Sequence, residues 1–378
     1  MKEIPSDKLN VRNDIVYEIN SQTPFTGNEV QYYETGEIEF KFCYKDGQRE
    51  GKSITYYFSG QWNIKANYKK GELNGSWKSY YENGQLKEKS TYKNDIYDGP
   101  YESYHENGQL NGKSTYKNGV KEGTLQIFHE NGQLKYKANY KKGEINGSSE
   151  SYSENGQLNY KKTHKNGKRD GPQEYYYENG QLMDTYTYKN DVRDGSFESY
   201  YENGQLKEKG TFKNGERNGL WESYDTEGRL EYTDTYKNGE RDGPMECYRQ
   251  DGTLHSIFYY KNNVKVPPFE SYHKNGKLDY KVFIKDGKRD GPQEYYYENG
   301  QLMDTYTYKN DVRDGSFERY YENGLLKSKG THNNGKLDGI YESYYENGQA
   351  KEKSIYVNGS RKRLIKSYYE NGQPTIGT

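Results

Sequence analysis

The sequence predicts an all-β fold: an elongated, twisted single-layer antiparallel sheet of about fifteen tandem β-hairpins. Glycine recurs every 24 residues from Gly36 to Gly372, which is the mark of a repeat architecture. Short runs of aromatic and β-branched residues alternate with Asn-Gly turns, as in hairpins. Only 30% of the 378 residues are hydrophobic and 46 residues are Tyr, so the aliphatic side chains are too few for a large globular core.

The charge balance narrows the possible partners. Lys and Arg number 56 against 57 Asp and Glu, giving a net charge of −1, and a nucleic-acid binder that relies on a basic stripe is not expected. No window reaches the ~18 apolar residues of a membrane span. Residues 1–10 carry no apolar signal stretch. We expect an extracytoplasmic or cell-surface location if a signal peptide has been removed, and a cytoplasmic one otherwise.

Each repeat predicts two strands. In the unit Ser76–Gly99, the strand-like runs are Trp77–Tyr81 and Leu86–Tyr92, separated by an Asn-Gly turn. Asn-Gly between such runs is the strongest short-range hairpin signal, because both residues tolerate positive φ. Frequent Gly, Asn and Tyr oppose a helix. One unit is therefore a hairpin plus a return turn.

Three periodic series, represented by Tyr80, Leu86 and Tyr92, should form the packed side of the sheet. If the Glu-Asn-Gly turn is a three-residue loop with a left-handed Gly, Tyr80 lies opposite Leu86 and Tyr92 shares their face. A two-residue loop would instead place Tyr81 beside Leu86, so the register stays open. With strands ~4.8 Å apart, fifteen hairpins would span roughly 140 Å.

The repeated pattern GxWxxYYENGQLKxKxxYKNGxxDG, around Gly75–Gly99 and Gly195–Gly219, resembles the bacterial variant of the MORN repeat from about Val30 to Gly372. This resemblance implies a sheet of successive hairpins and non-catalytic roles: scaffolding, protein contact and, for some eukaryotic members, membrane association. Some bacterial members are labelled antitoxins, and others look like exported or surface proteins. The segment VRNDIVYEINSQTPFTG, residues 11–27, is similar to the leader of the second group.

Changes in the repeat suggest four segments. We expect an N-terminal leader or cap over 1–27, a repeat array over 28–266, a continued array over 267–360 and a C-terminal cap over 361–378. The division at 266 follows from Pro267 and Pro268, which cannot donate in a sheet ladder and should introduce a bend or a change of twist.

No catalytic, cofactor-binding or metal site is expected, and the chain is not predicted to be an enzyme. Cys43 and Cys247 are eight and a half repeats apart, too far for a disulfide in such an array. His105 and His129 occupy equivalent positions in adjacent repeats, ~9.6 Å apart, which does not suit shared zinc ligands. One Glu per turn, as at Glu82, provides neither a calcium loop nor a glycosidase pair in a cleft.

The remaining candidate is the surface. A second tyrosine series, which includes Tyr81, alternates with variable residues and should share the face opposite Tyr80 with the Trp77 series. Rows of exposed aromatic residues mark binding surfaces. The partner-binding candidates are Trp77, Tyr81, Tyr101, Tyr177, Phe197, Tyr201, Trp221, Tyr297, Phe317, Tyr321, Tyr341 and Tyr345.

We therefore predict a repeat scaffold whose Tyr- and Trp-rich face binds a protein. One alternative is a cytoplasmic antitoxin or immunity protein that clamps a toxin. Another is a glycan-binding surface protein, in which Tyr and Trp rings stack on sugars. A third possibility, that the same rings serve only to shield the backbone of a thin sheet, is equally compatible with the pattern.

Overall fold

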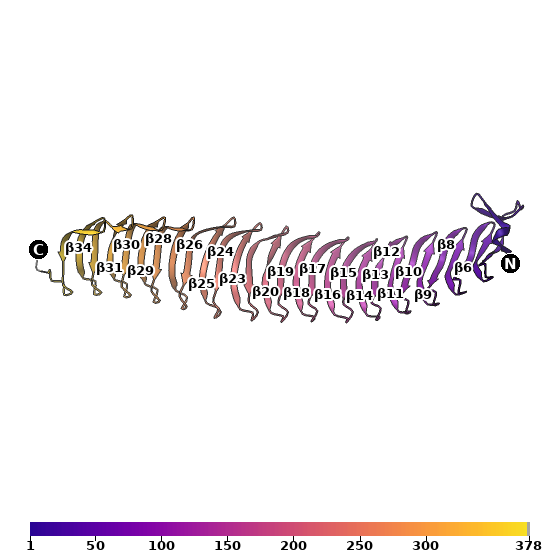
Figure 1. The fold of residues 1–378 in the computed structure, drawn as a ribbon, viewed down its shortest axis with the longest axis horizontal. Helices are drawn as coiled ribbons and strands as arrows, with labels where there is room; N and C mark the ends of the chain where they lie inside the picture. Colours follow the sequence, from indigo (N-terminus) through magenta and orange to yellow (C-terminus); the bar gives the residue numbers. More distant parts are fainter. Residues whose placement is uncertain (376–378) are drawn as a thin grey trace. The chain divides into compact units, whose positions relative to one another are not determined.

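The computed structural model describes residues 1–375 and divides into two compact units, residues 1–192 and a second unit that begins at Arg193. Both units are built of β-strands. Among the described residues the one helical element is the 3-10 turn η1 at Ser6–Lys8. Within each unit, from β4 onward, successive strands lie side by side in chain order (Figure 1). The predicted all-β, antiparallel repeat fold is confirmed.

The first unit holds β1 to β18. Their bounds are β1 Glu3–Pro5, β2 Leu9–Arg12, β3 Ile15–Glu18, β4 Gly27–Tyr32, β5 Ile38–Lys45, β6 Gln48–Tyr56, β7 Trp62–Lys69, β8 Glu72–Tyr80, β9 Leu86–Lys93, β10 Ile96–Tyr104, β11 Leu110–Lys117, β12 Val120–Lys121, β13 Gly123–Phe128, β14 Leu134–Lys141, β15 Glu144–Tyr152, β16 Leu158–Lys165, β17 Lys168–Tyr176 and β18 Leu182–Lys189.

The second unit starts at the second residue of β19. Its strands are β19 Val192–Tyr200, β20 Leu206–Lys213, β21 Glu216–Arg217, β22 Gly219–Tyr224, β23 Leu230–Lys237, β24 Glu240–Tyr248, β25 Leu254–Lys261, β26 Val264–Tyr272, β27 Leu278–Lys285, β28 Lys288–Tyr296, β29 Leu302–Lys309, β30 Val312–Tyr320, β31 Leu326–Asn333, β32 Lys336–Leu337, β33 Gly339–Tyr344, β34 Ala350–Val357 and β35 Ser360–Ser367.

The N-terminal segment closes the first unit. Strand β1 pairs with β4 in parallel, while β2 and β3 form a separate hairpin. Ile4, Val16, Phe25 and Tyr44 form a small buried cluster between this segment and the first repeat. Because β1 occupies the free side of β4, it covers what would otherwise be an exposed sheet edge.

The Glu-Asn-Gly turn is the three-residue loop that the sequence suggested. The Tyr81 N–H donates to the Gln85 carbonyl at 2.8 Å, and Gly84 has φ of 88°. Tyr80 lies opposite Leu86, as predicted. At the other end of the hairpin, Asn94 and Asp95 both have positive φ, the conformation of a two-residue hairpin turn.

One part of the predicted register is wrong. A β-bulge follows Tyr80: Tyr80 pairs with Leu86, but Ser79 pairs with Glu88 rather than Lys87. The extra residue reverses the alternation along β9, so Tyr92 lies on the face opposite Tyr80 and Leu86. The rings of Trp77 and Tyr92 accordingly lie near each other, with centroids 6.4 Å apart. The third aromatic series therefore belongs with the Trp77 series.

The sheet has two distinct faces, named here from one repeat. The aromatic face carries Trp77, Ser79, Ser90, Tyr92 and their equivalents, and the charged face carries Lys78, Tyr80, Leu86, Lys89 and theirs. Along the centre of the aromatic face, buried small residues such as Ser90 and Ala138 lie beside large rings. The rings cover the small residues and the backbone, so most of the burial in each unit is on this face.

The prolines at 267 and 268 shorten one ladder. Strand β26 continues through them, but its pairing with β27 begins only at Phe269, whereas β24 already pairs with β25 at Gly243 and Pro244. A single proline at the position of Pro268 does not remove the rung, since Pro244 pairs there. The shortened ladder accompanies the second proline, at 267, which stands where most other repeats have glycine and has no N–H to donate.

Candidate binding surface

The second tyrosine series connects neighbouring repeats. Tyr81 lies just beyond the end of β8, and its hydroxyl donates to the carbonyl of Tyr104 in the next repeat at 2.9 Å. The same bond joins Tyr33 to Tyr56, Tyr57 to Tyr80, Tyr201 to Tyr224, Tyr297 to Tyr320, Tyr321 to Tyr344 and Tyr345 to Tyr368. Each ring is thus fixed at one end while its body stays half-exposed. We call this contact the tyrosine clamp.

Other side chains make the clamp where tyrosine is replaced. In His129 and His273 the Nε2 atom lies 3.0 Å from the carbonyl oxygen of Tyr152 and Tyr296 respectively. The Arg249 guanidinium reaches the Tyr272 carbonyl. Ser153 is too short for this contact and bonds within its own turn. Tyrosine, histidine and arginine thus make the same polar contact to the next repeat, whereas Ser153 does not.

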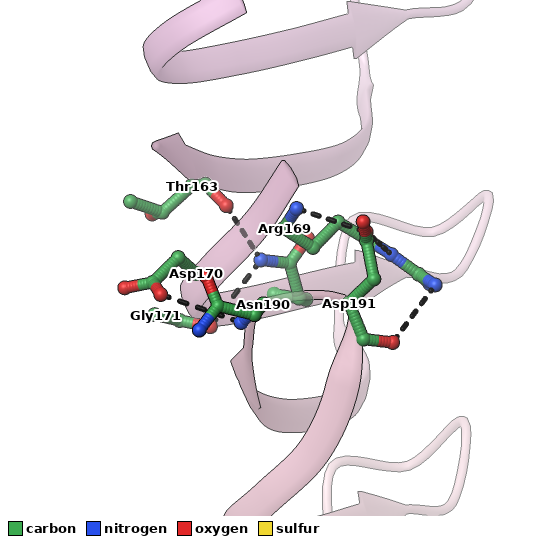
Figure 2. A network of polar contacts seen from close by, with 7 residues as sticks. Thr163, Arg169, Asp170, Gly171, Asn190 and Asp191 are labelled. Atoms are coloured by element: carbon green, nitrogen blue, oxygen red, sulfur yellow. Dashed lines mark hydrogen bonds and ion pairs between the residues drawn. The ribbon is translucent and has the colours of Figure 1, made fainter. Parts of the chain in front are cut away.

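A second clamp lies at the opposite ends of the strands. Arg169 donates from its backbone N–H and its Nε to Asp191 Oδ1 at 3.0 and 3.2 Å, and the Asn190 N–H donates to Asp170 Oδ2 at 3.3 Å (Figure 2). The backbone bond of Arg169 lowers the pKa of the Asp191 carboxyl. Arg289 and Asp311 repeat the arrangement in the second unit. These bonds fix each return turn to the repeat before it.

The charged face carries a ladder of phenols and carboxylates. In Tyr152 and Tyr176 the hydroxyl donates to the Glu two residues earlier at 2.8 and 2.7 Å. Lysines on adjacent strands add ion pairs, such as Lys209 to Glu222 at 2.7 Å. Burial, followed by the bond to Glu150, raises the pKa of Tyr152 to about 12. Bonds from Lys353 and Tyr344 hold the pKa of Glu342 at about 2.

Three of the predicted partner-binding residues are not exposed. Phe197, Trp221 and Phe317 are 7%, 2% and 6% exposed, so the expectation that these rings present a surface is wrong. The reason is the strand partner: Phe197 lies opposite Gly210, and Trp221 packs against the other side of the same glycine, with the two ring centroids 5.3 Å apart. Phe197 and Trp221 thus fill the space that Gly210, which has no side chain, leaves between them.

The other nine candidates are half-buried. Trp77, Tyr101 and Tyr341 lie on the aromatic face, where Trp77 and Tyr101 flank Ser90 from either side. The others belong to the second tyrosine series at the hairpin turns; they are Tyr81, Tyr177, Tyr201, Tyr297, Tyr321 and Tyr345. Their partner-binding role remains a prediction.

The phenol–carboxylate ladder was not identified from the sequence. The signal was present, because Glu precedes the first-series Tyr by two residues in most repeats from Glu102 to Glu342. Two residues apart in a strand means the same face, so this spacing could have revealed the contact.

Within residues 1–375, no three or more His, Cys, Asp or Glu side chains gather in a way that could hold a metal ion, and Cys43 and Cys247 are both free. This described part of the chain contains no helix with the length and hydrophobicity of a membrane span.

A comparison with solved structures returns matches to large toxin-complex chains. The crystal structures of TcdB2-TccC3-Cdc42 and TcdB2-TccC3 show 11% and 12% identity with TM-scores of 0.16 and 0.17, covering 94% and 95% of this chain but only 23% and 28% of theirs. The Photorhabdus luminescens Tc holotoxin pore with the TccC3-D651A mutation gives 11% identity, a TM-score of 0.15, and coverage of 95% and 27%. This chain thus spans about a quarter of their length, and TM-scores this low carry no argument.

A comparison with curated proteins returns no match. The model of the family described as MORN repeat variant matches twelve segments, which are residues 25–46, 73–94, 97–118, 121–142, 145–166, 169–190, 193–214, 217–238, 268–286, 289–310, 313–334 and 337–358. Together they cover more than half of the chain, with the same 24-residue step as the hairpins and clamps described above. The chain therefore belongs to the MORN repeat variant family.

Proposed function

We propose that this protein is a non-catalytic scaffold that binds a protein partner through rows of clamped tyrosines. The observation that carries the proposal is the run Tyr297, Tyr321 and Tyr345, three consecutive repeats in which a half-exposed ring is fixed by its own hydroxyl. A second run, Tyr33, Tyr57 and Tyr81, does the same in the first unit.

Fixed rings favour binding for an energetic reason. Ordering a free side chain at an interface costs ~0.5–1.5 kcal/mol, and a ring already fixed by a hydrogen bond avoids much of that cost. Lysines add positive charge beside these rings. The ammonium groups of Lys327 and Lys351 lie 5.3 and 5.2 Å from the ring centroids of Tyr321 and Tyr345, respectively. Tyr together with a cation provides an amphipathic contact suited to a protein surface.

The experiment uses a substitution that the array itself contains. Changing Tyr297, Tyr321 and Tyr345 to His should keep the clamp, as His129 and His273 do, while altering the exposed contact. Proteins retained by the immobilised wild-type chain would be purified singly and titrated against both forms by calorimetry. We expect at least a tenfold weaker Kd for the triple variant, with an unchanged melting temperature. Leu220→Ser, at an exposed position on the charged face, serves as the control.

A purified partner that binds the triple variant as tightly as the wild type would contradict the proposal. An exported or cell-surface location, which the leader resemblance suggests, is a separate expectation. Fractionation of the source cells tests it, and recovery of the full chain only from the cytoplasm would exclude it.

A further inference from the structure

The charged face contains one group of repeats that departs from the ladder pattern. In the first unit, Lys65 on β7 lies directly opposite Lys78 on β8, and Lys78 lies opposite Lys89 on β9. In the next hairpins that central position is filled by Glu102, and later by Glu150 and Glu174. Lys78 therefore stands where the array usually provides the carboxylate that neutralises its lysine neighbours.

A second unusual lysine lies beside the first. Lys52 on β6 lies on the same face, two residues before Ile54, which pairs with Lys65. Its equivalents in later repeats are uncharged; in order, the next five are Ser76, Pro100, Thr124, Ser148 and Pro172. Lys52 and Lys78 are thus two cations that most later repeats lack, and both lie near Lys65.

None of these three lysines is neutralised by an acidic side chain within residues 1–375. Ion pairs of the ladder type begin one strand later, with Lys89 and Glu102 at 3.5 Å. The Lys65 ammonium instead lies 2.7 Å from the centroid of the Trp62 ring, which takes the place of the usual leucine. Burial, and then the charges of Lys78 and Lys52, lower the pKa of Lys65.

The three lysines line a shallow depression on this face. Asn67, Ser76 and Tyr80 also line it and add an amide and two hydroxyl groups. Like charges directly opposite one another destabilise a sheet, and the array avoids this cost in the hairpins that follow by using Glu. Three ammonium groups with three neutral polar side chains around a depression match a compact, multiply charged oxyanion.

We infer that Lys52, Lys65 and Lys78 form a binding site for a phosphate or sulfate group, either as the free ion or as a monoester on a larger molecule. The site is independent of the tyrosine surface proposed above, since it lies on the charged face and on different side chains. Loss of one would leave the other intact, and the two proposals can fail separately.

The test compares the wild type with Lys78→Glu, which restores the ladder residue and should fold. Inorganic phosphate and inorganic sulfate would be titrated at constant ionic strength, with chloride as the balancing salt, while amide chemical shifts of β6 to β8 are followed. We expect saturable shifts in the wild type and at least a tenfold weaker Kd in Lys78→Glu. Lys52→Ser should also weaken binding.

Gln126→Glu is the control, because it places the same carboxylate at the equivalent position of another repeat, between Lys113 and Lys137. It should bind phosphate like the wild type. Without added anion, Lys78→Glu should melt above the wild type at low salt. A phosphoserine tetrapeptide distinguishes the two sources: tighter binding than inorganic phosphate indicates a monoester, and equal or weaker binding indicates the free ion. Identical phosphate affinity in the wild type and Lys78→Glu, or shifts that chloride reproduces, would overturn the inference.

Discussion

A single methyl group added at Gly210 should destabilise the second unit. Gly210 lies within β20, between the rings of Phe197 and Trp221, and its backbone does not adopt positive φ. A Cβ there would lie 2.3 Å from a carbon of the Trp221 ring. That ring is 2% exposed and is also bounded by Phe212, with centroids 5.1 Å apart, so it has little room to move. The effect of Gly210→Ala is therefore steric.

Gly210→Ala should destabilise the second unit, although the same substitution in an ordinary strand is stabilising. Replacing a strand glycine by alanine is normally favourable by roughly 0.5–1 kcal/mol, whereas overpacking a filled site costs about 1–3 kcal/mol. We expect a net loss on the order of 1–2 kcal/mol for Gly210→Ala. Gly330→Ala should lose less stability, because the nearest ring atom of Phe317 would be 2.8 Å from the new Cβ. Gly112, where the nearest atoms are at 3.3 and 3.4 Å, should be neutral or slightly stabilised.

Urea unfolding measures this series. With Trp62 and Trp77 changed to Phe, the fluorescence of Trp221 reports on the hairpins around Gly210, and circular dichroism follows the Gly330 and Gly112 variants. The expected order of stability loss is Gly210, then Gly330, then Gly112. A Gly210→Ala protein as stable as its parent, or a larger loss at Gly112, would refute the ring-over-glycine packing.

Three further predictions concern the ladder and the clamp. The pKa of Tyr152 is raised to about 12 from an ordinary 10.0, so the stability that its hydroxyl contributes to the fold is complete below pH 10 and is lost as the pH rises toward 12. A near-ultraviolet titration should therefore show a late tyrosinate phase, and the absence of that phase would exclude the ladder. Glu342→Gln should lower the free energy of unfolding at pH 7 by about 1 kcal/mol after solvent screening, but should have little effect near pH 2. The carboxylate is fully stabilising above its ordinary pKa of 4.5 and loses that effect as the pH falls toward 2. A pH-independent difference would count against this pair. Tyr321→Ala should lose about 1–2 kcal/mol of thermal stability while Tyr321→His loses little, and equal losses would argue against the clamp.

Much of the fold could be predicted because local signals agree. Asn-Gly turns, strict 24-residue spacing and alternating aromatic residues each specify hairpins, and the left-handed Gly84 fixes the three-residue loop and the pairing of Tyr80 with Leu86. The sequence suggested this loop but left a two-residue alternative open, because Asn-Gly suits both loop lengths.

The assignment of faces was not predictable in the same way. The bulge after Tyr80 adds one residue to β9, and its position depends on how Ser79 and Glu88 pair rather than on any single residue type. A shift of one residue moves a side chain to the other face. This bulge therefore places Tyr92 on the face opposite the one that the sequence predicted. Burial of Phe197 and Trp221 likewise depends on Gly210 in an adjacent strand.

The surface was predicted only in part. The periodicity identified the second tyrosine series, but the bond from Tyr81 to the Tyr104 carbonyl crosses 23 residues and depends on the spacing of two repeats in space. In the sequence, Lys52 and Lys78 differ from the equivalent residues of later repeats. Only the strand register of the structure shows that both lie near Lys65 on the same face.

Hydrogen exchange of the wild type and Gly210→Ala, resolved by peptide, tests whether each hairpin depends only on its immediate neighbours. We expect faster exchange to be confined to β19 to β23, around the displaced ring, while β28 to β34 exchange as in the wild type. Faster exchange of equal size in all strands from β19 to β34 would show that the repeats unfold as one cooperative body and would contradict this expectation.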